Sequence, residues 1–195
     1  MVLVPASSFL IGVALEETWV DPYYPEYRVL GSACPQREIY LSDYYIDIYP
    51  VTNKQYKKFI DETGHHLPSP RGAPWDGGLD EYGWDQLDRL YPAGTDYYPV
   101  VLVSWYDALA YCEWAEKRLP TEAEWEKAAR GADGRPYPWG SNSNIYAYGH
   151  FYEHWFEAPR VPRADLKPVN AHPAGTSIFG CQDMLGNVQE WCADW

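Results

Sequence analysis

Two carboxylates near the end of the sequence have the spacing of a cation site. Asp183 and Glu190 flank the dipeptide Gly186-Asn187, which is a turn signal. If the chain turns there, the two carboxylates converge, and the carbonyl oxygens of Gly186 and Val188 point to the same place. Calcium takes about six to eight oxygen ligands of these two kinds. The alternative is a hairpin in which the acids only accept hydrogen bonds from backbone N–H groups.

Histidines are the second residue type that suits metal chemistry. His150 and His154 are four residues apart, and on a helix this spacing would place both imidazoles on one face. Gly149 and two nearby prolines leave little room for a helix, and no third ligand is evident, so we assign no metal there. His65 and His66 fall in a long loop, where we expect them to be solvated.

The four cysteines, at positions 34, 112, 181 and 192, lack the Cys-x-x-Cys spacing of a zinc ribbon. A catalytic thiol needs a nearby cation or a helix N-terminus to lower its pKa. Cys112 falls inside an expected helix beside Glu113, and Cys192 falls in an apolar context. Cys34 is expected to be exposed. We therefore assign no catalytic cysteine.

Three helices are expected to position these groups. Each begins at a capping box, a hydroxyl residue followed three residues later by an acidic or amide side chain: Thr52 with Gln55, Ser104 with Asp107, and Thr121 with Glu124. Glycines at 64 and 131 are expected to end the first and third helices. Caps and pairs four residues apart then account for the charged residues Arg118, Glu122, Glu124 and Arg130, with no need for acid–base catalysis.

Strands are expected to be short. Apolar residues alternate around a Pro-Ala-Ser-Ser turn in residues 1–12, and a second strand region covers 39–48. We also expect a short strand at 100–103 and two strands on either side of Gly186-Asn187. Residues 65–99 and the tract from 133 to 180 are expected to be loops, because they are rich in turn residues and lack a period.

The composition indicates one compact domain, residues 1–195, with an aromatic core. The chain is 46% apolar and holds 10 Trp and 18 Tyr, and its net charge is −13. Such an acidic surface repels phosphate groups, so nucleic acids and anionic membranes are disfavoured partners. No apolar run approaches the roughly 18–20 residues of a membrane span, and the first residues lack the features of a secretory signal.

Four stretches of the sequence resemble the sulfatase-modifying-factor family, which includes the formylglycine-generating enzymes. They are residues 1–12, 44–56, 99–140 and 183–191, in the family's order. The third stretch is the most specific, since it holds Val-Ser-Trp, Ala-Tyr-Cys-Glu-Trp-Ala, Lys-Arg-Leu-Pro-Thr-Glu-Ala-Glu-Trp-Glu and Pro-Trp-Gly. The resemblance implies an irregular α+β fold, a variant of the C-type-lectin fold with two or three short helices, small antiparallel sheets and many loops.

The resemblance also implies metal sites. A structural Ca²⁺ site is implied at Asp183, Gly186, Val188 and Glu190. A second calcium site would use Asn144 and Ile145 with a later acid, for which Asp165 is the nearest choice. The alternative for Asn144 is a plain turn residue.

This chain departs from the family's oxidases after Trp191. There the oxidases carry an Arg-Gly-Gly-Ser motif, two reactive cysteines that bind copper, and a closing Gly-Phe-Arg, whereas this sequence stops at Trp195. We therefore expect the chain to be part of a longer protein and to be inactive alone. Copper would belong only to a full-length parent that carries those cysteines.

Three hypotheses for function follow from the resemblance. The leading one is a part of a formylglycine-generating oxidase, which converts a cysteine of a client sulfatase to formylglycine. The alternative is a non-catalytic ligand-binding module of the same family, for which the acidic, aromatic loop 65–99 would suit a peptide. The third, a relative of sulfoxide synthases, would need iron ligands on a helical bundle that this sequence lacks. The residues leave the cellular compartment open.

Overall fold

The computed structural model describes residues 1–13, 35–69, 83–151 and 166–194. Four short strands precede the first helix in the sequence: β1 (Val2–Val4), β2 (Ser7–Ile11), β3 (Arg37–Leu41) and β4 (Tyr44–Ile46). Three α-helices follow: α1 (Asn53–Thr63), α2 (Trp105–Trp114) and α3 (Glu122–Arg130). Two single turns of 3₁₀ helix complete the set: η4 (Ile145–Ala147) and η6 (Pro173–Gly175). The expected irregular α+β fold with three helices is confirmed.

The sheets are two separate antiparallel pairs. β1 pairs with β4, with Val2 opposite Ile46, and β2 pairs with β3, with Phe9 opposite Ile39. The turn between β1 and β2 therefore moves the chain from one pair to the other. Both strand regions that the alternation predicted, residues 1–12 and 39–48, are confirmed.

All three predicted helix starts are confirmed. At Thr52, Ser104 and Thr121, the hydroxyl accepts the N–H of the third helical residue, whose side chain accepts the N–H of the cap. α1 ends at Gly64, where φ is 71°, and α3 ends at Gly131, where φ is 73°. Both glycines occupy the left-handed region that favours this residue at helix ends.

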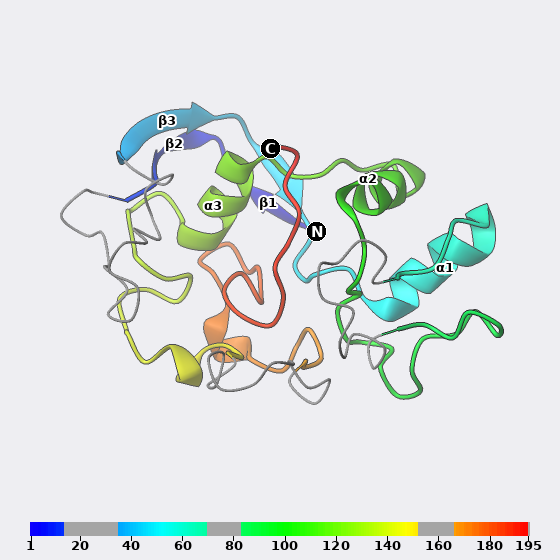
Figure 1. Cartoon of the computed structure of the whole chain (residues 1–195). Helices are drawn as coiled ribbons and strands as arrows, with labels where there is room; N and C mark the ends of the chain where they lie inside the picture. The colour runs from blue at the N-terminus through cyan, green and yellow to red at the C-terminus, as the bar shows by residue number, and fades with distance from the viewer. Residues whose placement is uncertain (14–34, 70–82, 152–165, 195) are drawn as a thin grey trace, which may run out of the picture.

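Two hydrophobic clusters form the core. The first, which we call the α1–α2 cluster, is mostly aromatic: Tyr56, Phe59, Ile60, Leu67, Trp84 and Tyr111. The second, the α3 cluster, holds smaller residues from distant parts of the sequence: Val4, Ala128, Ala129, Cys181 and Met184. The segment that ends the chain runs between α3 and α2 (Figure 1).

A buried lysine connects α3 to the first strands. Lys127 is 0% exposed, and its ammonium group donates to the carbonyl oxygens of Pro5 at 2.8 Å and Ser7 at 3.1 Å. Burial lowers the pKa of Lys127. Because Pro5 lies in the turn between β1 and β2 and Ser7 begins β2, the lysine fixes the end of that turn against the helix.

The strand expected at residues 100–103 is wrong. Leu102 has a φ of 61°, which breaks an extended run, and its carbonyl oxygen accepts the N–H of Ser69. Only the neighbouring Pro99 forms an isolated bridge, with Thr52. The apolar run instead packs on the α1–α2 cluster through Val100 and Val103.

The hairpin expected around Gly186-Asn187 is also wrong. Residues 184–194 form no strand, because several of their polar groups bond to other segments instead of pairing as two strands. The N–H of Ala193 donates to Pro120, and the indole N–H of Trp105 donates to the carbonyl of Cys192. The indole of Trp191 donates to the carbonyl of Val103. These bonds hold the segment against the residues that precede α2 and α3.

Among the described residues, no helix has both the length and the apolar character needed to cross a membrane.

Candidate functional site

The loop of residues 183–191, which we call the 183–191 loop, turns sharply at three positions. Asp183, Gly186 and Asn187 have positive φ angles of 57°, 99° and 61°. A Cβ atom on Gly186 would lie 2.6 Å from the carbonyl oxygen of His150, so only glycine allows this approach. Gly186-Asn187 is therefore a turn, as its residue types indicated, although no strands flank it.

Asn187 fixes the loop to two other segments. Its N–H donates to the carbonyl of His150 at 2.8 Å. Its side-chain oxygen accepts the N–H of Lys167 at 3.1 Å, and its amide donates to the carbonyl of Lys167 at 3.1 Å. The same amide also donates to Oδ2 of Asp183 at 3.0 Å. One side chain thus orients the first carboxylate of the predicted calcium site.

Both predicted acidic ligands lie in surroundings that oppose their ionisation. Burial raises the pKa of Asp183, against the hydrogen bond from Asn187 and the nearby His172. Burial also raises the pKa of Glu190 to about 7, and the carboxylates of Asp183 and Asp47 raise it further. Glu190 is solvent-accessible as a residue. Its carboxyl group, however, faces a cavity and accepts the indole N–H of Trp125 at 3.1 Å.

The donor set of the 183–191 loop fits calcium chemically. Asp183 and Glu190 supply carboxylates, the first of which raises the pKa of the second, and the turn supplies backbone carbonyls. The carbonyl of Gly186 accepts the N–H of Val188 at 2.8 Å, which places the two backbone ligands in one tight turn. All four are hard oxygen donors, the kind that calcium prefers. Calcium binding here stays a prediction.

The second predicted calcium site begins at η4. Asn144 precedes this turn, and its carbonyl oxygen accepts the N–H of Ala147 at 3.1 Å. The carbonyl oxygen of Ile145 accepts the N–H of Tyr148 at 3.0 Å. Asp165 lies outside the described residues. Since the structure uses both carbonyls within the turn, the second site also stays a prediction.

The cysteines of the described residues do not suit catalysis. Cys112, Cys181 and Cys192 are free thiols. Burial raises the pKa of Cys112, and raises that of Cys181 and of Cys192 to about 11. Copper and catalysis both need thiolates, so these thiols do not fit the copper pair that the resemblance implies. Cys34 lies outside the described residues.

The histidines behave in two ways. His150 lies in a loop and His154 lies outside the described residues, so no helix is seen that would support a metal at this pair. The expectation of a solvated side chain is wrong for His65 and confirmed for His66, whose side chain is 69% exposed. The His65 side chain is only 23% exposed, and both histidines contact the Asp107 carboxylate. Sequence reasoning missed this cluster because it treated Asp107 only as a helix cap.

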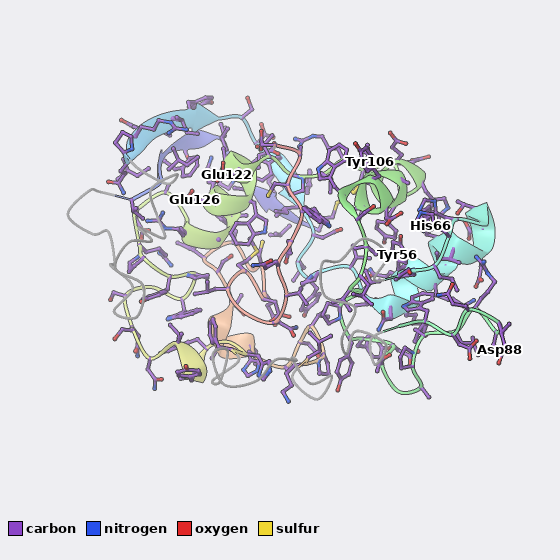
Figure 2. The ribbon with its side chains drawn as sticks, in the orientation of Figure 1. Tyr56, His66, Asp88, Tyr106, Glu122 and Glu126 are labelled. Carbon is purple, nitrogen blue, oxygen red and sulfur yellow. The ribbon has the colours of Figure 1, made fainter. Side chains whose placement is uncertain are left out.

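The charged residues around α3 act structurally, as predicted. The Arg118 guanidinium donates to both carboxylate oxygens of Glu124, and Arg130 pairs with Glu126 one turn before it. Glu122 and Glu126 are carried by α3 (Figure 2). These pairs hold the two ends of α3.

An open cavity of about 450 Å³ lies between the two clusters. Its walls come from four stretches: residues 44–51, one face of α2, residues 116–120 and residues 188–191. Tyr111 and Tyr56 line it from the α1–α2 cluster, and Met184 lines it from the α3 cluster. Its size is in the range of about 300–1,000 Å³ typical of ligand pockets. Glu190, one of the two carboxylates of the predicted calcium site, also lines this cavity.

Comparison with known families identifies the kind of domain. The family model of the sulfatase-modifying factor enzyme 1-like domain matches residues 1–195. Two relatives are named formylglycine-generating enzyme. The one from Thermomonospora curvata is 35% identical over 231 aligned positions, which cover 100% of this chain and 71% of the relative. The one from Mus musculus is 31% identical, over 100% of this chain and 58% of the relative.

A third relative carries a different name. The protein named inactive C-alpha-formylglycine-generating enzyme 2 from Mus musculus is 34% identical over 82% of this chain and 60% of its own length. The chain therefore spans about three fifths of the length of both mouse relatives.

Proposed function

This chain belongs to the sulfatase-modifying factor family, and we propose that it forms part of a formylglycine-generating oxidase. Such an oxidase would convert a cysteine of a client sulfatase to formylglycine with molecular oxygen. The observation that carries the proposal is the family match across residues 1–195, together with the two relatives of that name at 31% and 35% identity. The catalytic copper-binding cysteines would be supplied by sequence outside these 195 residues.

The chain's own contribution is a scaffold and part of a substrate groove. The cavity of about 450 Å³ supports this role, because it is lined by aromatic rings and a few charged groups. Lys117 and Asp47 form an ion pair of 2.7 Å among its lining residues. An extended client segment could bury apolar side chains there while its backbone meets these polar groups.

Calcium binding at the 183–191 loop is the second element of the proposal. Asp183 and Glu190 would supply carboxylates, and Gly186 and Val188 would supply carbonyl oxygens. Burial raises the pKa of both carboxyl groups, and a divalent cation would stabilise their ionised forms because its charge offsets the loss of hydration. The ion would be structural and would fix the loop that lines the cavity. Asn144 and Ile145 would take part in a second site.

Calcium is tested by melting temperature. We expect millimolar Ca²⁺ to raise the melting temperature of the chain and EDTA to reverse the increase, because binding to the native state adds stability. Asp183→Ala should abolish the response. The control is Asp88→Ala, since Asp88 lies in the exposed loop 85–88, far from this site (Figure 2). An equal response in both variants, or none in the wild type, would disprove calcium binding at this loop.

The oxidase proposal is tested on the gene and then on the protein. Sequencing the native gene past the Trp195 codon should find Arg-Gly-Gly-Ser and two cysteines. The full gene product, loaded with copper, should then convert a cysteine peptide to the aldehyde, which mass spectrometry detects. The 195 residues alone should leave the peptide unchanged. A continuation without the two cysteines would refute the oxidase proposal.

The second candidate is a non-catalytic binding module. The relative named inactive, at 34% identity, favours it, because the matched residues are compatible with that name too. On this alternative the cavity would bind a peptide that is not oxidised. The same sequencing experiment separates the two candidates, and a gene continuation without the cysteine pair would favour the binding module.

A further inference from the structure

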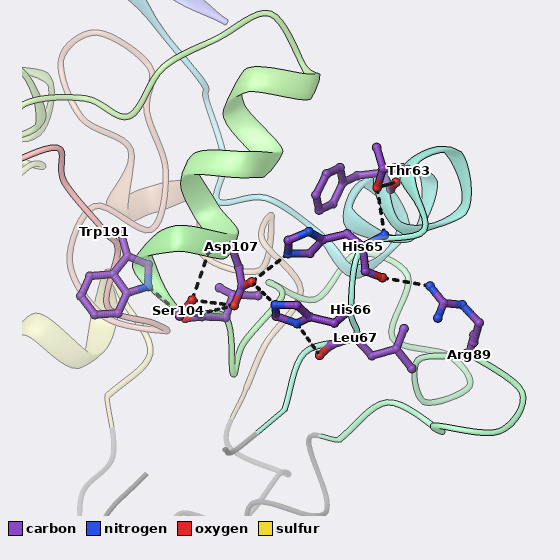
Figure 3. Close-up of polar contacts among 10 residues, drawn as sticks. Thr63, His65, His66, Leu67, Arg89, Ser104, Asp107 and Trp191 are labelled. Atoms are coloured by element: carbon purple, nitrogen blue, oxygen red, sulfur yellow. Dashed lines mark hydrogen bonds and ion pairs between the residues drawn. The ribbon is translucent and has the colours of Figure 1, made fainter. Parts of the chain in front are cut away.

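Two histidines and one aspartate meet between α1 and α2. Nε2 of His65 lies 2.8 Å from Oδ1 of Asp107, and Nε2 of His66 lies 2.9 Å from the same oxygen. The ligand atoms of all three residues lie within 4.8 Å of one another. Figure 3 shows both rings directed at the carboxylate at the start of α2. Among the described residues, this is the one group of three metal-ligating side chains that lie so close together.

Local structure holds Asp107 and His65 in place. Oδ2 of Asp107 accepts the N–H and the hydroxyl of Ser104 at 2.8 and 2.7 Å, so the helix cap uses one carboxylate oxygen and leaves Oδ1 to the histidines. The ring of His65 packs 4.9 Å from that of Phe59. The guanidinium of Arg89 donates to the carbonyl of His65 at 3.0 Å. The His65 side chain is thus fixed before any ion binds.

We propose that His65, His66 and Asp107 bind a first-row transition-metal dication such as Zn²⁺. Two imidazoles and one carboxylate are the donors that zinc takes in three-ligand sites, where water fills the fourth position. Such nitrogen donors select against Ca²⁺ and Mg²⁺, which prefer oxygen. The site is therefore distinct in chemistry from the predicted calcium site at the 183–191 loop.

The distances to Oδ1 are close to those of a zinc site. Ligand atoms in a tetrahedral zinc site lie about 3.3 Å apart, because each bond is about 2.0–2.2 Å long. The two imidazole nitrogens now lie 2.8 and 2.9 Å from Oδ1, so each would move away from this oxygen by about half an ångström. His66 is free to move by this amount, since its side chain is 69% exposed.

The surroundings favour the ionised form of Asp107 and offer a hydrogen-bond partner to Nδ1 of His66. Burial opposes ionisation of Asp107, but hydrogen bonds from His65 and Ser104 outweigh it, and the pKa of Asp107 is lowered. Nδ1 of His66 lies 3.5 Å from the carbonyl of Leu67. That carbonyl is positioned to accept a hydrogen bond from Nδ1–H when Nε2 binds the metal, which is the usual arrangement of ligating histidines.

The metal would join the end of α1 to the beginning of α2. His65 and His66 follow directly after Gly64, the C-cap of α1, and Asp107 is the third residue of α2. Figure 2 places His66 beside both helices. Because these two helices enclose the α1–α2 cluster, zinc at this site should stabilise that cluster and leave one coordination position open to water or to a donor atom of a partner.

The test is calorimetric titration of the chelator-treated chain with ZnCl₂. We expect one zinc to bind per chain and to raise the melting temperature. His66→Gln should weaken this binding roughly tenfold or more, and the exposure of His66 makes unfolding of this variant unexpected. The control is His172→Gln, which removes an imidazole from a distant loop and should leave zinc affinity unchanged. Addition of Ca²⁺ should not displace the zinc.

A second measurement separates ligation from a structural effect. Co²⁺ in place of zinc should give visible d–d absorption with the wild type and His172→Gln, and the His65→Gln, His66→Gln double variant should lose it. Zinc that binds equally well to the double variant would overturn the proposal, because the ligands would lie elsewhere. No binding of Zn²⁺ or Co²⁺ at micromolar concentration would overturn it as well, and would leave the three side chains as a hydrogen-bonded cluster only.

Discussion

The two hydrophobic clusters of this chain are built in opposite ways. The α1–α2 cluster takes its rings from residues 56–111, and four of them contact one another: Tyr56 lies 5.2 Å from Phe59, 5.6 Å from Tyr111 and 6.1 Å from Trp84 between ring centroids. The α3 cluster instead gathers Val4, two alanines, Cys181 and Met184 from both ends of the sequence.

The clusters therefore depend on different forces. Large rings bury much apolar area each and also attract one another edge to face, so the α1–α2 cluster is stabilised by its own side chains. The small side chains of the α3 cluster bury less area. Specific polar contacts must hold its distant segments together, such as those of Lys127 with the β1–β2 turn and of Asn187 with Lys167.

The largest expected effect is in the α1–α2 cluster. Phe59→Ala should lower the free energy of unfolding by about 3–5 kcal/mol, because Phe59 is 2% exposed and its removal leaves a cavity among rings that cannot close. Urea denaturation measures the change. Tyr106→Ala is the control, since Tyr106 is 67% exposed on α2 (Figure 2) and should cost less than about 0.5 kcal/mol.

Removal of a buried polar atom from the same cluster should not lower the free energy of unfolding. Within the described residues, the buried hydroxyl of Tyr56 has no hydrogen-bond partner. Tyr56→Phe should therefore leave the free energy of unfolding unchanged or raise it by about 1 kcal/mol, because it removes an unsatisfied polar atom. A clear loss of stability in this variant would show that the α1–α2 cluster also depends on polar contacts.

The next largest effect should come from one polar residue beside the α3 cluster. Asn187→Ala should cost about 3 kcal/mol, since it removes two hydrogen bonds to the backbone of Lys167 and puts alanine at a φ of 61°. Denaturation by urea gives the value. Asn187→Gly removes the same bonds without the backbone strain, so it should cost about 1 kcal/mol less. Equal costs would exclude the contribution of strain.

Truncation of an apolar side chain in the α3 cluster should lower the free energy of unfolding by less than a truncation in the α1–α2 cluster. Met184→Ala is expected to lower the free energy of unfolding by about 2 kcal/mol, near the lower end for buried methionine. The reason is that Met184 also lines the open cavity, so its side chain has fewer neighbours to lose. The adjacent Leu185, which is 37% exposed, gives the matched control Leu185→Ala. A cost for Met184→Ala as large as that for Phe59→Ala would refute the contrast.

The parts that sequence analysis predicted correctly depend on local signals. Thr52, Ser104 and Thr121 cap helices, because each hydroxyl residue and its capping-box partner lie three residues apart. This spacing is visible in the sequence without knowledge of the fold. The alternation in residues 1–12 likewise reports a strand by itself. The irregular α+β fold followed from these elements and from the family resemblance.

The parts that it missed depend on contacts between distant residues. Gly186-Asn187 indicated a hairpin, but Asn187 bonds to Lys167 and His150, and no pattern near position 187 shows this. The apolar run at 100–103 indicated a strand, but packing of Val100 and Val103 on the α1–α2 cluster replaced pairing. The contact of His65 and His66 with Asp107 links residues about 40 positions apart, beyond any local spacing.

The smallest effect concerns the charged cap of α3 and depends on pH. The hydrogen bond from Arg118 lowers the pKa of Glu124 below its ordinary value of 4.5, although burial opposes this shift. A carboxylate with a lowered pKa in the folded state stabilises the protein above pH 4.5 and loses this contribution as the pH falls through its folded-state value. Glu124→Gln should therefore cost about 1 kcal/mol at pH 7, and the cost should shrink below pH 4.5.

Local measurements would connect this effect to the two clusters. α1 is capped by the neutral Gln55 and α3 by the ionisable Glu124, so amide hydrogen exchange should show acid loosening α3 more than α1. The matched control is Glu122→Gln, an exposed residue of the same helix turn, which should leave the acid response of α3 unchanged. If α1 and α3 loosened together as the pH fell, the clusters would unfold as one unit, and their different construction would have no consequence for local stability.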